Sequence, residues 1–117
     1  ADELVRLGIF QSEDVKGANA LANIRRVFPH SIGHYLGMDV HDIPSVPLNR
    51  PLAPGMVITI EPGLYIPDSP DMPSAFRGLG IRIEDDVWIP GDGPCILSEG
   101  CAKTPEEIES LIATSHP

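Results

Sequence analysis

The chain has 117 residues, of which 42% are hydrophobic, a composition ordinary for globular proteins. A chain of this length is expected to form one small domain with a single modest core. Its eight basic and seventeen acidic residues give a net charge of −9, which argues against a surface for nucleic acid or anionic membranes. No apolar run approaches the roughly 18 residues of a membrane span, and no signal peptide opens the chain. We therefore expect a soluble intracellular protein.

Two helices are expected in the first quarter of the chain. Residues 2–7 carry apolar side chains at helical spacing and precede Gly8, a residue type that commonly ends helices. This segment is expected to be the last turns of a helix whose beginning is absent. A second helix is expected over residues 13–28, with Ser12 as its N-cap and Gly17 as a weak point.

The segment from Phe28 to Ile43 is expected to be extended or looping, because Gly33, Gly37 and the flanking prolines oppose a continuous helix. Two short strands are expected after it, over residues 56–61 and 63–66, with a kink or bulge between them.

Residues 81–89 form the clearest predicted strand. A period of two would place one set of side chains on the core face and the other set on the opposite face. The first set is Ile81, Ile83, Val87 and Ile89, and the second is Arg82, Glu84, Asp86 and Trp88.

The C-terminal part is expected to contain a tight turn over residues 90–94, a short edge strand over 95–97, and a helix over 105–113 capped by Thr104. These elements together predict the α+β class, with helices packed on one side of a mostly antiparallel sheet.

Three of the four histidines, His30, His34 and His41, lie within residues 29–42 around two glycines, and the run ends at Asp42. Imidazole is the commonest metal ligand, and its unperturbed pKa lies nearest to neutrality. The cluster therefore indicates a metal site, acid–base chemistry, or both. Asp42 is a candidate to orient the His41 ring.

Two glutamates extend the candidate site. Glu61 follows a β-branched run and precedes a Pro-Gly pair, where a buried carboxylate would need a partner. Glu84 is a candidate ligand, although an ion pair with Arg82 is an alternative. One histidine and two glutamates form a nitrogen-and-oxygen donor set, which suits manganese, cobalt, iron(II) or zinc. Cys95 and Cys101 lack a metal or redox spacing and are expected to be free thiols.

Three segments carry a family resemblance: PHSIGHYLGMDVHD at residues 29–42, TIEPGLYIP around Glu61, and GLGIRIEDDVWIP around Glu84. They resemble the aminopeptidase P and prolidase branch of the pita-bread metallopeptidases, and the likeness extends over the whole chain. It implies the pita-bread fold and two divalent metal ions, manganese first, with cobalt, zinc or iron as alternatives. The metal ligands implied are His34, Glu61 and Glu84.

The resemblance also implies roles beyond the metal ligands. Glu61 matches the general base, and His30 and His41 match histidines that bind substrate or intermediate. Arg82 matches an arginine that faces the metal site. For His30 and His41, an orienting contact with backbone is the alternative.

One departure from the family pattern is large. The family's sequence pattern begins with two metal-binding aspartates in a segment of the type DxG…DxTR, and this chain has no such segment. We therefore expect residues 1–117 to be the C-terminal half of a catalytic domain that carries three of five ligands. This half alone is expected to be inactive.

The expected activity is that of an Xaa-Pro aminopeptidase, which releases the N-terminal residue of a peptide with proline in second position. Prolidase, which cuts dipeptides ending in proline, is the alternative, and the short connection from His41 to Glu61 favours aminopeptidase P. Methionine aminopeptidase fits less well, because its corresponding motif ends in His-Glu. A non-enzymatic pita-bread module would have lost the ligands. For the full-length protein we expect a mitochondrial or cytoplasmic location and a capacity to form homodimers.

Overall fold

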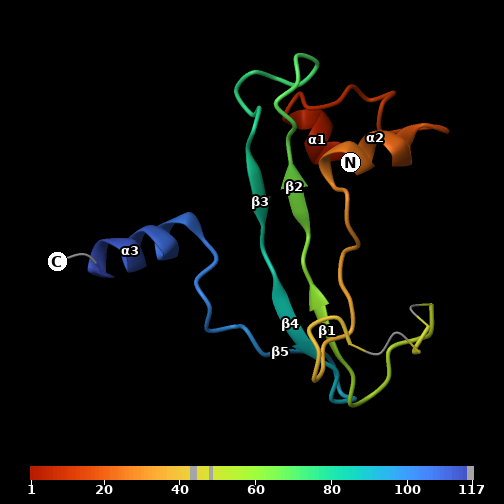
Figure 1. Ribbon diagram of the computed structural model, residues 1–117, viewed down its shortest axis with the longest axis vertical. Coiled ribbons are helices and arrows are strands. Elements are labelled where there is room, and N and C mark those ends of the chain that lie inside the picture. The colour runs from red at the N-terminus through yellow and green to blue at the C-terminus, as the bar shows by residue number, and fades with distance from the viewer. Residues whose placement is uncertain (43–44, 48, 116–117) are drawn as a thin grey trace. The chain divides into compact units, whose positions relative to one another are not determined.

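The structure is a computed structural model that describes residues 1–42, 45–47 and 49–115 (Figure 1). The described residues divide into two compact units. Unit 1 consists of residues Ala1–Ile32 and Glu61–Arg82, and unit 2 consists of the described residues within 33–60 and 83–115. No helix among the described residues is long and apolar enough to cross a membrane.

Unit 1 contains two short helices and a two-stranded sheet. The helices are α1 (Asp2–Arg6) and α2 (Ala20–Val27), and the antiparallel strands are β2 (Gly63–Tyr65) and β3 (Gly80–Arg82). Figure 1 shows β2 and β3 side by side, with the chain between them returning as a loop.

A cluster of buried apolar side chains holds unit 1 together. Val27, at the end of α2, has no exposed surface. Burying a valine side chain of this kind stabilises a fold by about 1.5–3 kcal/mol. The buried members of the cluster are Ile9, Phe10, Val15, Val27, Ile66 and Met72. Helix residues and the β2–β3 loop therefore share one core.

The first predicted helix is confirmed, and the second is shorter than predicted. Helix α1 is followed by Gly8 at φ +69°, as expected for a residue that ends a helix. The second helix begins at Ala20, with Asn19 as its N-cap, so the prediction of a start at residue 13 with Ser12 as cap is wrong. Gly17 adopts φ +77°, a left-handed conformation that a continuous helix cannot include.

Unit 2 contains a three-stranded antiparallel sheet and the C-terminal helix α3 (Pro105–Ser115). The strand order is β1 (Val57–Ile60), β4 (Asp85–Trp88) and β5 (Cys95–Ile96), which confirms the expected short edge strand. Figure 1 shows β1 beside β4.

The segment before β1 is irregular, as expected, over its described residues 28–42; Ile43 lies outside the described part of the chain. This segment nevertheless lies beside β1. Tyr35 forms an isolated antiparallel bridge with Ile58, and the Thr59 N–H donates to the His34 carbonyl at 2.9 Å. The glycine- and proline-rich run therefore extends the sheet of unit 2 without forming a regular strand.

The prediction of one strand over residues 81–89 is wrong. Strands β3 and β4 are separated by Ile83 and Glu84, and each pairs with a different partner. The segment that pairs with these strands is interrupted at Pro62, a residue that has no backbone N–H to donate to a strand ladder. Of the four side chains predicted for the core face, Val87 is buried, whereas Ile81 is 62% exposed.

Helix α3 begins with the predicted cap. The Glu107 N–H donates to Thr104 Oγ1 at 3.2 Å, and Glu107 Oε2 accepts from the Thr104 N–H at 2.9 Å. These reciprocal bonds form a capping box, which satisfies N–H groups that the first turn of a helix leaves without partners. Pro105 occupies the first helical position, where its missing N–H has no cost.

Candidate metal centre

His34 is oriented by hydrogen bonds to two neighbouring segments. Its backbone N–H donates to Thr59 Oγ1 at 3.1 Å, and its Nδ1 lies 2.9 Å from the Tyr35 carbonyl oxygen. A carbonyl oxygen can only accept, so Nδ1 carries a hydrogen and the lone pair of the neutral ring is on Nε2. This is the arrangement by which a backbone carbonyl prepares a histidine to bind a metal through its other nitrogen.

Gly33 allows the His34 segment to approach β1 closely. A Cβ atom at this position would lie 2.0 Å from the Thr59 carbonyl oxygen, far inside van der Waals contact. Gly37 is less restricted, because a Cβ there would lie 1.9 Å from Asp42 Oδ2, a side-chain atom that can move aside. The groups that approach these glycines are the backbone carbonyl of Thr59 and the carboxylate of Asp42.

Glu84 and His41 both lie close to His34 within unit 2. A carboxylate oxygen of Glu84 is within 4.8 Å of a ring nitrogen of His34, although the Glu84 side chain is exposed. The rings of His34 and His41 have centroids 4.5 Å apart and an interplanar angle of 75°. Three of the predicted site residues are therefore brought together in this unit.

Glu61 and Arg82 lie together in unit 1. Glu61 is 8% exposed, and its Oε2 is 3.6 Å from Arg82 Nη1. The expected partner of this buried carboxylate is thus Arg82, and the alternative pairing of Arg82 with Glu84 is not the one that the structure shows. Arg82 is itself half exposed, so the pair contributes little to stability through charge attraction alone. Arg82 therefore lies beside Glu61, a candidate metal ligand.

His30 is held by backbone and by a residue that the sequence did not indicate. Its Nδ1 lies 2.7 Å from the Ser31 carbonyl oxygen, and its Nε2 lies 3.2 Å from the hydroxyl of Tyr65. The carbonyl again fixes the hydrogen on Nδ1, so a neutral His30 accepts a hydrogen from Tyr65. A Cβ at Gly63 would lie 2.8 Å from the Tyr65 hydroxyl and 3.0 Å from His30 Nε2, which explains a glycine at that position.

A second group of polar residues surrounds Asp85, next to Glu84. Asp85 Oδ1 accepts from Lys103 Nζ at 2.8 Å and from Ser98 Oγ at 2.6 Å. The hydrogen bond from Lys103, followed by that from Ser98, holds the pKa of Asp85 below its ordinary value, and the Asp85 carboxylate raises the pKa of Lys103. Sequence spacing contained no signal for this group, because it joins residues 13 and 18 positions apart.

The residues present fit a divalent metal ion. His34 presents a prepared imidazole nitrogen, Glu84 lies within reach of it, and Glu61 is a buried carboxylate directly after β1. This nitrogen-and-oxygen donor set suits manganese, cobalt, iron(II) or zinc. Cys95 and Cys101 are exposed free thiols, as predicted, and contribute no thiolate ligand to this set.

The chain belongs to metallopeptidase family M24, whose family model matches residues 4–90. It is 54% identical over 112 residues to human Xaa-Pro aminopeptidase 3, covering 95% of this chain and 22% of that protein. The expected resemblance to the aminopeptidase P branch of the family is confirmed. The chain is also 49% identical over 111 residues to the mitochondrial intermediate cleaving peptidase 55 of Arabidopsis thaliana, covering 95% of this chain and 21% of that protein.

Solved structures show the same fold. The aminopeptidase P of Escherichia coli with the inhibitor Pro-Leu superposes with a TM-score of 0.81 at 42% identity, covering 97% of this chain and 26% of that chain. The predicted α+β pita-bread fold is therefore confirmed. The chain spans about a fifth to a quarter of the length of these relatives.

Proposed function

We propose that the full-length protein that contains this chain is a metal-dependent Xaa-Pro aminopeptidase. The observation that carries this proposal is that the Tyr35 carbonyl orients the His34 ring, with a carboxylate oxygen of Glu84 within 4.8 Å of a ring nitrogen, in a chain of family M24.

His34, Glu61 and Glu84 would hold the metal, and two divalent ions, manganese first, would activate a water molecule for attack on the scissile carbonyl. Glu61 is included because it is a buried carboxylate directly after β1 and because the family resemblance matches it to a metal ligand.

The chain's own residues would handle the proton and the developing charge. Glu61 is the proposed general base, which takes a proton from the attacking water and passes it to the leaving amine. Arg82 Nη1 lies 3.6 Å from Glu61 Oε2 and is proposed to hold this carboxylate in position. His41, whose ring lies against that of His34, is proposed to donate a hydrogen bond to the oxygen of the attacked carbonyl.

His30 is proposed to bind substrate and not metal. Its Nδ1 is engaged by Ser31, and its Nε2 is engaged by the Tyr65 hydroxyl, so both ring nitrogens already have polar partners. A substrate group can exchange with the hydroxyl at Nε2 without moving the ring. The predicted role of His30 in substrate binding thus remains a proposal. Tyr65, which contacts His30, is proposed to line the same substrate position.

The proposed substrates are peptides with proline in the second position. Support comes from human Xaa-Pro aminopeptidase 3 and from the Escherichia coli aminopeptidase P structure, whose inhibitor is Pro-Leu. We also propose a mitochondrial location for the full-length protein, because the Arabidopsis thaliana relative carries that designation. Subcellular fractionation with detection of the protein in the matrix would test the location.

The specificity experiment uses the full-length protein loaded with manganese and three peptides. Arg-Pro-Pro should lose its N-terminal arginine, whereas Arg-Ala-Pro should be cut far more slowly. Equal rates on these two peptides would identify a general aminopeptidase. Activity confined to a dipeptide such as Ala-Pro would identify prolidase. Either result would contradict the proposal.

A further inference from the structure

Glu84 is exposed, so packing of its own side chain does not determine where its carboxylate points. The next residue, Asp85, is held much more firmly. Asp85 begins β4, and its carboxylate accepts from Lys103 at 2.8 Å and from Ser98 at 2.6 Å. The direction of the Glu84 side chain therefore depends on a backbone that its neighbour fixes.

The same loop that supplies Ser98 also holds the backbone one residue further along β4. The Asp86 N–H donates to Ser98 Oγ at 3.0 Å, and the Asp86 carbonyl accepts from the Leu97 N–H at 2.8 Å. Lys103 Nζ in turn donates to the Ser98 carbonyl oxygen at 2.9 Å. Lys103 thus links the side chain of Asp85 to the loop that holds Asp86.

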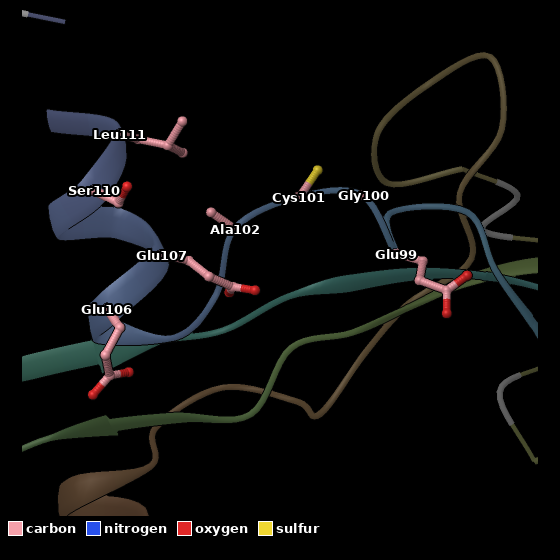
Figure 2. Close-up of a pocket in the computed structure, with 8 residues that line it drawn as sticks. All are labelled: Glu99, Gly100, Cys101, Ala102, Glu106, Glu107, Ser110 and Leu111. Atoms are coloured by element: carbon pink, nitrogen blue, oxygen red, sulfur yellow. The ribbon is translucent and has the colours of Figure 1, made fainter. Parts of the chain in front are cut away.

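Lys103 is itself anchored by the capping residues of α3. Glu107 Oε2 accepts from the Lys103 N–H at 3.0 Å as well as from Thr104. Figure 2 shows Glu107 on α3 with its carboxylate beside the loop that carries Ala102. A continuous set of hydrogen bonds therefore runs from the start of α3 through Lys103 to Asp85, next to Glu84.

We propose that Lys103 is a positioning residue for the metal centre, which acts through Asp85 to direct the Glu84 carboxylate toward His34. The proposal rests on the proposed role of Glu84 as a ligand. Without the ammonium group, Asp85 keeps only its bond to Ser98, and the backbone at Glu84 gains freedom. Groups that hydrogen-bond a ligand directly typically contribute 10- to 100-fold to metal affinity, and we expect Lys103 to fall within this range although its contact is with the neighbouring residue.

Lys103 and Asp85 are about three-quarters buried, with 25% and 26% of their side chains exposed. A lysine is rarely this buried unless it is paired, and the pairing with Asp85 gives both groups a defined position. Lys16, by contrast, is an exposed lysine of unit 1, and none of the described hydrogen bonds around Asp85 involves it. It provides a matched control.

The test uses the full-length protein with Lys103→Met, Lys103→Arg and Lys16→Met, and measures manganese affinity by calorimetry and the electron paramagnetic resonance spectrum of bound Mn²⁺. We expect Lys103→Met to weaken manganese binding about 10- to 100-fold and to broaden the spectrum. Lys103→Arg should retain most of the wild-type manganese affinity, and Lys16→Met should leave that affinity unchanged. Urea denaturation of each metal-free variant measures whether the fold itself has changed.

A double-mutant cycle separates positioning from general destabilisation. Glu84→Ala should weaken binding, and Lys103→Met added to it should have little further effect, because both act on one ligand. Wild-type affinity in Lys103→Met, or full additivity in the double variant, would overturn the positioning role. Wild-type affinity in Glu84→Ala would overturn the ligand assignment itself, so the two failures are distinguishable. If Lys103→Met does not fold, Ser98→Ala, which removes the other bond to Asp85, takes its place in the cycle.

Discussion

Replacing Gly33 by alanine tests whether close packing against β1 determines the position of His34. The new Cβ would lie 2.0 Å from the Thr59 carbonyl oxygen and 3.0 Å from its carbon. Both are backbone atoms of a paired strand, so they cannot rotate away as a flexible side chain would. Forcing an extra methyl group into such a contact typically costs about 1–3 kcal/mol of stability.

Gly100→Ala is the control, because a Cβ at that position meets no atom within 4 Å and its backbone does not need a left-handed conformation. That variant should change the free energy of unfolding by less than about 1 kcal/mol, in the stabilising direction. Gly33→Ala should be destabilised and should also bind manganese more weakly, since the displaced segment carries His34.

The assay is urea denaturation of the metal-free full-length protein, together with manganese calorimetry on the same preparations. Equal stability and equal manganese affinity in Gly33→Ala and Gly100→Ala would refute the argument that the Thr59 carbonyl leaves no room for a side chain.

Three further predictions concern the catalytic site, the core and the surface. His41→Ala should lower kcat by about 10²- to 10³-fold with metal content unchanged; metal analysis showing joint loss of ions would make His41 a ligand. Val27→Ala should cost about 2 kcal/mol in urea denaturation, since Val27 is fully buried, and an unchanged midpoint would contradict this. Asp71, whose pKa is lowered to about 2 by hydrogen bonds from Ser69 and Arg26, should titrate near that pH by NMR. The stabilising effect of the ionised Asp71 carboxylate should be complete above its ordinary pKa of 3.8 and lost as the pH falls toward 2. In Ser69→Ala the titration midpoint of Asp71 should rise, and an unmoved midpoint would contradict the role of Ser69.

Local signals in the sequence predicted several elements correctly. The β-branched run at residues 57–60 forms β1, Gly8 follows α1, and Thr104 caps α3 as expected. Each of these depends on the conformational preference of one residue or a short run. Such preferences act over a few residues and are visible without knowledge of the rest of the fold.

The error over residues 81–89 arose because a partner elsewhere in the chain decides the outcome, whereas the late start of α2 follows from the local conformation of Gly17. The alternating pattern of residues 81–89 continues through Glu84. The segment that pairs with these residues is interrupted at Pro62, so they form two strands, β3 and β4. The site shows the same limit. Family resemblance indicated His34, whereas the roles of Thr59 and Lys103 depend on contacts that no local pattern encodes.

The most direct test of the account is a crystal structure of the full-length protein with manganese, with the ions located by anomalous scattering. We predict two ions, bound by His34 Nε2 and by carboxylate oxygens of Glu61 and Glu84. His30 and His41 should lie near the ions without binding them. Ions bound elsewhere, or a His34 that binds through Nδ1, would contradict the account.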